Sequence, residues 1–255
     1  NSDCDDNASD IIPGVNEVCG DKIDNNCNHT IDENCFIDVN IDTDFEYIEQ
    51  GWPMGLSVSQ TNTEALSSTP YESLVVPPHF TPNGFDSTLY GYLTLGNSSD
   101  NRFSFAVNIR WADQNIYHYY FYVDLNNNED LTDDGEPFSN EGTGRLAAHV
   151  SLNVDVVTNP GSTITRPYRL WMWLDDTNNV RFYARCHYRG ELTIGEATYT
   201  AVAYEYSTHD TLYRDHGLYI DLDHDGELNR DTENFMHREI LTINGQAYEL
   251  MLNYP

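Results

Sequence analysis

Residues 116–138 read IYHYYFYVDLNNNEDLTDDGEPF, and residues 218–235 read LYIDLDHDGELNRDTENF. Both stretches begin with aromatic and β-branched residues, which favour β-strands, and both continue into an acidic loop that closes on phenylalanine. When the loops are aligned from Asp124 and Asp221 without a gap, oxygen-bearing side chains recur at loop positions 1, 3 and 5. The repeat therefore predicts one kind of acidic loop that is carried twice on β-strands.

These loops have the chemistry of a hard divalent cation. Calcium takes about six to eight oxygen ligands, which alternate side chains of a curled loop can supply while position 7 offers its backbone carbonyl. In an EF-hand the closing acid is at position 12, but here the acid comes one residue later. A solvated Asx-rich turn is the alternative. The predicted calcium ligands are Asp221, Asp223, Asp225, Glu227 and Glu233 in one loop, and Asp124, Asn126, Asn128, Asp130 and Glu136, with Asp133 and Asp134 in reserve, in the weaker one.

A third loop of this kind lies near the N-terminus. From Asp24 onward, oxygen side chains again occupy positions 1, 3, 5 and 9, and His29 stands where glycine is preferred. The predicted ligands are Asp24, Asn26, Asn28, Thr30 and Asp32. Three loops and a further acidic strand predict two to four bound Ca²⁺ ions.

The segment around this loop carries a recognisable pattern. It runs Asp3-Cys-Asp-Asp6, Pro13-Gly14, Glu17-Val-Cys19 and Asp32-Glu-Asn-Cys35. This pattern resembles the Cys-rich metal-binding motif of MopE-type secreted bacterial proteins. The resemblance implies an extracellular cation-binding module in which Asp3 and Asp5 join Asp24, Asn26, Asn28 and Asp32 as ligands. Oxygen-only ligands favour calcium over copper or zinc.

Cysteine usage points to the same compartment. Cys4, Cys19, Cys27 and Cys35 lie in a short acidic segment that has too few apolar residues for a core. Such segments are held by disulfides in oxidising compartments or by metal. Four cysteines allow three pairings, and zinc is the rival interpretation. The fifth, Cys186, is expected to be a buried free thiol.

The net charge of −30, with a single lysine, argues against nucleic acid and anionic membranes as partners. There is no apolar run long enough to span a membrane. The chain begins at Asn1 without a basic and apolar leader, which predicts a mature secreted product. We expect a secreted, extracellular or cell-surface protein without membrane insertion.

Periodicity predicts an all-β fold. Residues 36–47 alternate as one half-buried strand, and residues 57–70 are Ser/Thr-rich and predict a loop or linker. Many short apolar strands predict a two-sheet antiparallel β-sandwich, preceded by a small disulfide- or metal-stabilised N-terminal segment. The expected divisions are 1–35, 36–80 and 81–255. Strands are expected at 87–95, 102–110, 116–125, 145–157, 168–174, 180–188, 198–206, 216–222, 238–243 and 246–253.

The C-terminal part has a resemblance of its own. Residues 188–199, 217–226 and 239–248 are similar to a module of uncharacterised secreted bacterial proteins that combines a G-x-x-Y strand pair with a D-x-D-x-D-G loop. The resemblance implies a β fold and no particular activity.

No catalytic motif is visible, so we expect no enzyme. Histidines at 209, 216, 224 and 237 are expected to be surface or satisfied residues, with a copper site as the alternative. Three function classes follow. The first is a calcium-stabilised structural protein of a cell surface, matrix or filament, whose partner is another copy of itself in a homopolymer or cell-surface material. The second is a MopE-like copper-binding surface protein, and the third is a calcium-dependent carbohydrate-binding module that uses Trp52, Trp111, Trp171 or Trp173.

Overall fold

The computed structural model describes residues 11–18, 21–33, 35–56, 62–80, 86–98, 101–113, 116–159 and 161–253. Within these ranges the protein is almost entirely β, as the sequence predicts. The described residues contain one α-helix of a single turn, α1 (Ile41–Asp44), and two short 3-10 helices, η1 (Pro78–Phe80) and η2 (Tyr213–His216). Across the described ranges, no helix has the length and apolar character that crossing a membrane requires.

The chain forms two compact units, and each combines segments that are distant in sequence. The first unit consists of Asn1–Glu46, Tyr188–Ala203 and Arg214–Pro255, and the second of Tyr47–His187 and Tyr204–Tyr213. Each of these units draws on more than one of the predicted segments 1–35, 36–80 and 81–255. That these three segments are separate domains stays a prediction.

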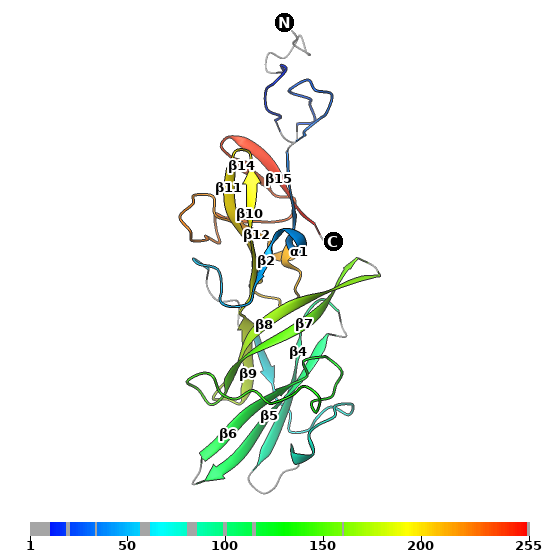
Figure 1. The fold of residues 1–255 in the computed structure, drawn as a ribbon, viewed down its shortest axis with the longest axis vertical. Helices are drawn as coiled ribbons and strands as arrows, with labels where there is room; N and C mark the ends of the chain where they lie inside the picture. Colours follow the sequence, from blue (N-terminus) through cyan, green and yellow to red (C-terminus); the bar gives the residue numbers. More distant parts are fainter. Residues whose placement is uncertain are drawn as a thin grey trace. The chain divides into compact units, whose positions relative to one another are not determined.

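The second unit is a two-sheet antiparallel β-sandwich, which confirms the predicted fold class. One sheet has the strand order β3-β9-β8-β7, and the other has the order β4-β5-β6 (Figure 1). All neighbouring strands in both sheets are antiparallel. The strands are β3 (Asn62–Ala65), β4 (Ser87–Thr94), β5 (Arg102–Asp113), β6 (Ile116–Val123), β7 (Ala147–Asn159), β8 (Ser162–Leu174) and β9 (Asn179–Ala184).

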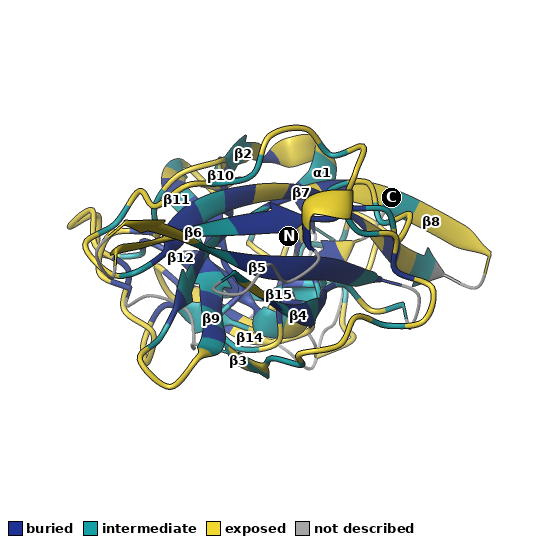
Figure 2. Ribbon diagram, turned by 90° about the horizontal axis from the view of Figure 1, so that it is seen from below, coloured by how far each residue is buried: buried dark blue, intermediate teal, exposed yellow. Residues whose placement is uncertain are grey.

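One hydrophobic core lies between these two sheets. Phe105 and Phe121 from the three-stranded sheet share a buried cluster with Val150, Leu170 and Phe182 from the four-stranded sheet. The buried stretches of β5 and β7 are dark in Figure 2. Burial of each such side chain stabilises the fold by about 1.5–3 kcal/mol. One face of each sheet is therefore buried in this core, and the other face of the three-stranded sheet carries a second, smaller buried cluster that includes Tyr90, Ala106 and Tyr122.

The first unit contains two further sheets. One has the antiparallel order β13-β12-β11-β10, and the other has the order β1-β15-β14, in which β1 runs parallel to β15. The register of the parallel pair extends from Phe36 opposite Glu249 to Asn40 opposite Asn253. The strands are β1 (Phe36–Asn40), β10 (His187–Ile194), β11 (Ala197–Ala203), β12 (Leu218–Ile220), β13 (Asn234–Phe235), β14 (Ile240–Ile243) and β15 (Gln246–Asn253), and β2 (Glu46–Ile48) spans the boundary between the units.

The prediction of one continuous strand over residues 36–47 is wrong. The strand stops at Asn40, whose side-chain oxygen accepts from the N–H of Asp42 over 3.1 Å and caps α1. In return, the N–H of Asn40 donates to the carboxylate of Asp44 over 2.7 Å. Reciprocal capping of this kind starts a helix, and acidic residues favour its first turn.

Two other expectations need correction. The Ser/Thr-rich stretch contains a strand, β3, which pairs with β9 and forms the edge of the four-stranded sheet. The predicted strand 180–188 is two strands, β9 and β10, which break at Arg185 and Cys186. Cys186 is a buried free thiol, as predicted.

Candidate metal centre

The loop between β12 and β13 brings three predicted ligands together. Carboxylate oxygens of Asp221, Asp223 and Glu233 lie within 4.8 Å of one another. Strand pairing creates this arrangement, because β12 and β13 are antiparallel neighbours and the N–H of Ile220 donates to the carbonyl of Glu233 over 2.9 Å. The hairpin therefore places the first and last predicted ligands of the loop side by side.

Burial makes this carboxylate group costly on its own. Asp221 is 7% exposed and Glu233 is 5% exposed. Oδ2 of Asp221 accepts from the N–H of Gly226 over 3.2 Å, whereas its Oδ1 is buried and has no hydrogen-bond partner among the described residues. Buried charges in proteins are normally paired or coordinate a metal. The free Oδ1 atom therefore points to a position that a cation can occupy.

Asp225 and Glu227 lie outside this close group, and both are exposed. Oδ1 of Asp223 accepts from the N–H of Asp225 over 3.2 Å, and Oδ1 of Asp225 accepts from the N–H of Glu227 over 2.8 Å. These successive Asx turns curl the loop. Ligation by the Asp225 carboxylate and by the Glu227 carbonyl stays a prediction.

All three acidic loops share an unusual backbone conformation. Residues at loop positions 4 and 6 have positive φ, which side chains other than glycine rarely adopt. Position 4 is Cys27 (φ 61°), Asn127 (φ 57°) or His224 (φ 59°), and position 6 is His29 (φ 74°), Glu129 (φ 64°) or Gly226 (φ 83°). The sequence repeat thus corresponds to a repeat in three dimensions, including the positions where His29 and Glu129 replace glycine.

The carboxylate at position 1 accepts from the N–H groups of positions 5 and 6 in the 24 and 124 loops, and from that of position 6 in the 221 loop. The carboxylate of Asp124 accepts from the N–H groups of Asn128 over 3.0 Å and Glu129 over 2.8 Å. The carboxylate of Asp24 accepts from Asn28 over 3.0 Å and from His29 over 2.7 Å. Backbone N–H groups hold these first carboxylates in place, so each loop is folded around its predicted first ligand.

In the 124 loop, a different acid closes the site. Oδ1 of Asp134 accepts from the N–H of Leu125 over 2.8 Å, while its Oδ2 is buried without a partner in the described part of the chain. Asn126 and Asn128 both direct their amide groups to Asp133. Ligation by Glu136, which is exposed, and by the Asp130 carbonyl stays a prediction.

Crowding raises proton affinity in this loop. Burial raises the pKa of Asp124 above its usual range, and the nearby Asp133 raises it further, although backbone N–H groups oppose the shift. Burial also raises the pKa of Asp134, with added repulsion from Asp124 and Asp133. A divalent cation among these groups would reverse both effects, because it favours the ionised carboxylates.

The N-terminal loop is organised around Glu17 and Glu33. The carboxylate of Glu17 accepts from the N–H groups of Asn26 over 3.0 Å and Asp32 over 3.1 Å. The amide groups of Asn26 and Asn28 both contact Oε1 of Glu33. Loop spacing alone did not select Glu17 or Glu33 as site residues, because both lie off the alternating positions. Thr30 is exposed, and its N–H donates to Oδ1 of Asn28.

The structure leaves part of this module untested. Asp3 and Asp5, two of the predicted ligands, lie outside the described residues, as do Cys4 and Cys19. Cys27 and Cys35 each take part in a disulfide bond. Which cysteine pairs with which stays a prediction.

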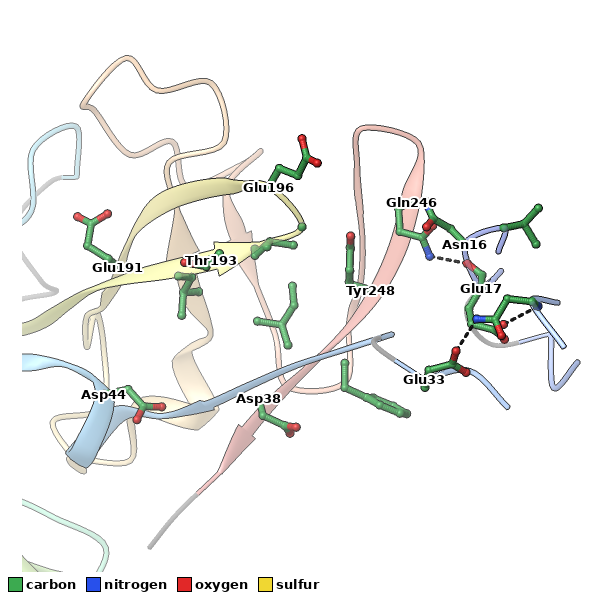
Figure 3. A pocket seen from close by; sticks show the side chains of 17 residues that line it. Asn16, Glu17, Glu33, Asp38, Asp44, Glu191, Thr193, Glu196, Gln246 and Tyr248 are labelled. Carbon is green, nitrogen blue, oxygen red and sulfur yellow. Dashed lines mark hydrogen bonds between the residues drawn. The ribbon is translucent and has the colours of Figure 1, made fainter. Parts of the chain in front are cut away.

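An acidic pocket of about 790 Å³ lies within the first unit. Figure 3 shows Glu17 and Glu33 at one side of it and Asp38 on β1 near its floor. The side chain of Gln246 donates to the carbonyl of Glu17 over 2.6 Å. The other acidic residues that line the pocket are Asp44, Glu191 and Glu196.

Three of the four histidines that could be copper ligands make other contacts. Nδ1 of His237 accepts from the N–H of Leu252 over 3.1 Å, and the ring of His224 stacks on Tyr199 with centroids 4.8 Å apart. His209 is buried, with Nδ1 2.8 Å from the hydroxyl of Tyr168. These contacts confirm the expectation of satisfied histidines at these three positions.

Comparison with known proteins identifies the N-terminal segment. The geometry defines an all-β protein with acidic loops that each fold around the carboxylate of their first residue. Residues 3–35 match the family model Cu-binding_MopE, which is described as a putative metal-binding motif. The match is limited to that segment and does not extend to the two sheets that carry the other loops. No curated protein and no solved structure matches the chain.

Proposed function

We propose that this protein is a non-enzymatic, secreted protein of a cell surface, matrix or filament, and that it binds Ca²⁺ as a structural ion. The observation that carries the proposal is the group formed by Asp221, Asp223 and Glu233, with its oxygens within 4.8 Å. A buried carboxylate oxygen without a partner in the described chain, Oδ1 of Asp221, faces a cost that a cation would remove.

The choice of calcium rests on the donor atoms. The described loops offer carboxylate, amide and backbone oxygens, which suit calcium and magnesium, whereas zinc and copper favour thiolate and imidazole ligands. The loops are long and curled through positive-φ residues. Calcium tolerates such irregular shells better than magnesium, which demands octahedral geometry.

A structural role follows from charge. The chain carries 42 acidic and 12 basic residues, so its compact state is opposed by self-repulsion. Each Ca²⁺ cancels two negative charges at a site where they are most crowded. Secretion is part of the proposal, because the disulfide-bonded Cys27 and Cys35 suit an oxidising compartment.

Self-association is the remaining part of this proposal. Strand β6 lies at the edge of its sheet, and Ile116 and Tyr117 on it are exposed. An exposed apolar edge strand is a template for pairing with another chain. Strand β1 pairs with β15 of its own chain, so β1 is not the strand that we propose to exchange between copies.

A copper-binding surface protein is the second candidate. It is favoured by the match of residues 3–35 to a family model whose name refers to copper. Within the Asp24 loop the nearest imidazole donor in sequence is His29, whereas the contacts of that loop are made by oxygen and amide groups. Copper would therefore require ligands beyond those that shape the loop.

Metal analysis of the purified full chain tests both candidates. The protein is dialysed against equal amounts of Ca²⁺, Mg²⁺, Zn²⁺ and Cu²⁺, and bound metal is counted by mass spectrometry. We expect two to four calcium ions per chain. The variant Asp221→Asn should lose one of them, while the control Asp231→Asn, which removes an exposed acid of the same loop, should lose none. Retention of copper alone would support the second candidate and overturn the first.

A further inference from the structure

Three aromatic side chains lie together on the outer face of the four-stranded sheet. Trp171 and Trp173 alternate on β8 with the buried residues Met172 and Leu174, so both rings point away from the core. Tyr183 on β9 pairs with Trp171 in the strand register, and its ring centroid lies 5.7 Å from that of Trp173. This face therefore carries a continuous aromatic surface that the sandwich core does not use.

A loop turns this surface into a cavity. Gly142, Thr143 and Gly144 border a space of about 310 Å³ whose other walls include Trp171, Trp173 and Tyr183. Ligand sites in proteins begin at about this volume and combine apolar walls with a few polar groups. Here the polar groups are the Thr143 hydroxyl and the peptide groups of the loop.

The cavity is organised before any ligand binds. Oδ1 of Asn140 accepts from the N–H groups of Gly142 over 3.1 Å and Ala147 over 2.9 Å, and its amide donates to the carbonyls of Gly142 and Gly144. A Cβ at Gly142 would lie 3.3 Å from the Trp171 ring, so the loop rests directly on this tryptophan. Rigid aromatic walls lower the ordering cost of binding.

Trp171 also contacts His149, its cross-strand neighbour on β7. The two ring centroids are 4.5 Å apart, and Nδ1 of His149 lies 2.8 Å from Oε2 of Glu141, on the same loop. The loop and the neighbouring strand thus both help to hold this tryptophan in place. A ring that is fixed in this way and still half-exposed is suited to contact with a ligand.

We propose that this cavity binds a neutral saccharide, with pyranose rings stacked on Trp171 and Trp173. A pyranose presents C–H groups on its faces, which pack against the electron-rich faces of aromatic rings, and hydroxyls at its edge, which can bond Thr143 and the loop peptides. Anionic ligands are disfavoured by the charge of −30. The nearby Arg181 is already paired with Asp175 over 2.8 Å. This proposal goes beyond metal binding and does not depend on it.

The test uses the full chain and neutral hexasaccharides of glucose, xylose, mannose and N-acetylglucosamine, with hexagalacturonate as an acidic comparison. Binding is followed by calorimetry and by tryptophan fluorescence. We expect at least one neutral oligosaccharide to bind, and Trp173→Ala and Trp171→Ala to weaken that binding by about tenfold or more. Trp111→Ala is the matched control, because Trp111 is 42% exposed on β5 and does not line the cavity.

Several outcomes would overturn the proposal. These are no binding of any neutral oligosaccharide at about 1 mM, equal weakening by Trp111→Ala, or a preference for hexagalacturonate. If no saccharide binds and Trp171→Ala abolishes self-association, the aromatic surface is a contact between copies of the chain instead. If the alanine variants unfold, Trp171→Phe and Trp173→Phe replace them, and N-bromosuccinimide oxidation of the unaltered protein, with and without saccharide, reports whether these tryptophans are covered.

Discussion

The backbone N–H of Leu222 donates to Oε1 of Glu233 over 2.8 Å. The acid that closes the 221 loop is therefore bound to the residue directly after the first predicted ligand. The other oxygen of the same carboxylate accepts from the N–H of Asn229 over 2.8 Å. Leu125 and Asp134 repeat this bond in the 124 loop. Closing acids are thus positioned by the backbone, and a cation that enters the loop meets ligands that are already in place.

Asp221→Asn should change stability in opposite directions with and without calcium. In a chelator, the variant removes one charge from a crowded buried group and should melt at the same or a higher temperature than the unaltered protein. In calcium it should melt lower, because the unaltered protein gains about 2.7 kcal/mol when a site is filled at about 100 times its dissociation constant, and loss of a ligand weakens binding by at least about tenfold. Thermal unfolding by circular dichroism measures both, with Asp231→Asn as the control. Equal melting curves for all three proteins in calcium would contradict a calcium ion at this loop.

Asp134→Asn should weaken calcium binding at the 124 loop more than Glu136→Gln does. Asp134 has a buried oxygen without a partner in the described chain, whereas Glu136 is exposed. Each substitution removes one charge, so their difference reports position rather than net charge. Terbium luminescence, sensitised by the tyrosines of β6, follows the site. A larger loss of calcium affinity in Glu136→Gln than in Asp134→Asn would instead support Glu136, the closing ligand that the sequence spacing predicts.

Glu205→Gln should flatten the fall in stability with rising pH. Burial raises the pKa of Glu205 well above its usual range, and the adjacent Asp210 raises it further. The native carboxyl keeps its proton at pH values where an unfolded glutamate, with a pKa of about 4.3, has lost it. The contribution of Glu205 to the free energy of unfolding is therefore complete below the unfolded-state pKa, and it falls by about 1.4 kcal/mol per pH unit above that value.

Urea unfolding in a chelator, between about pH 5 and 7, measures this slope. Glu196→Gln is the control, because Glu196 is exposed and its substitution removes the same charge. A slope that is the same in both variants would mean that Glu205 is already ionised in the folded protein.

Cys186 should resist thiol reagents as long as the sandwich is folded. Burial raises the pKa of its thiol to about 12, and thiol reagents attack the thiolate. The N–H of Arg169 also donates to its sulfur over 3.3 Å. Labelling with iodoacetamide at pH 8 should follow the urea unfolding curve, and mass spectrometry of the modified peptide locates the label. Rapid labelling without urea would show that the sandwich opens locally at β9.

Local patterns made much of this fold predictable. Runs of aromatic and β-branched residues located β6 and β15 to within a few residues, because these residue types favour strands. Loop spacing located Asp221 and Glu233, because the hairpin between them is short. The parallel pairing of β1 with β15 could not be predicted, since nothing local encodes a register between segments over 200 residues apart.

The closing acid of the 124 loop was harder to select. Asp133, Asp134 and Glu136 are all suitable by type, and the bond from Leu125 to Asp134 depends on how the loop curls. The helical turn at α1 had a sequence signal, an asparagine followed by an aspartate four residues later, which the apolar alternation of residues 37–41 concealed.

The parallel pairing of β1 and β15 has a mechanical consequence. Residue 36 lies at one end of the paired segment, and residue 253 lies at the opposite end. Tension that pulls these two residues apart acts along both strands, so it loads the hydrogen bonds between them in shear, all at once, rather than opening them one at a time. A chain anchored through its N-terminal module and pulled from its C-terminal strand would resist extension at this pair, and single-molecule stretching should record it as a distinct force peak.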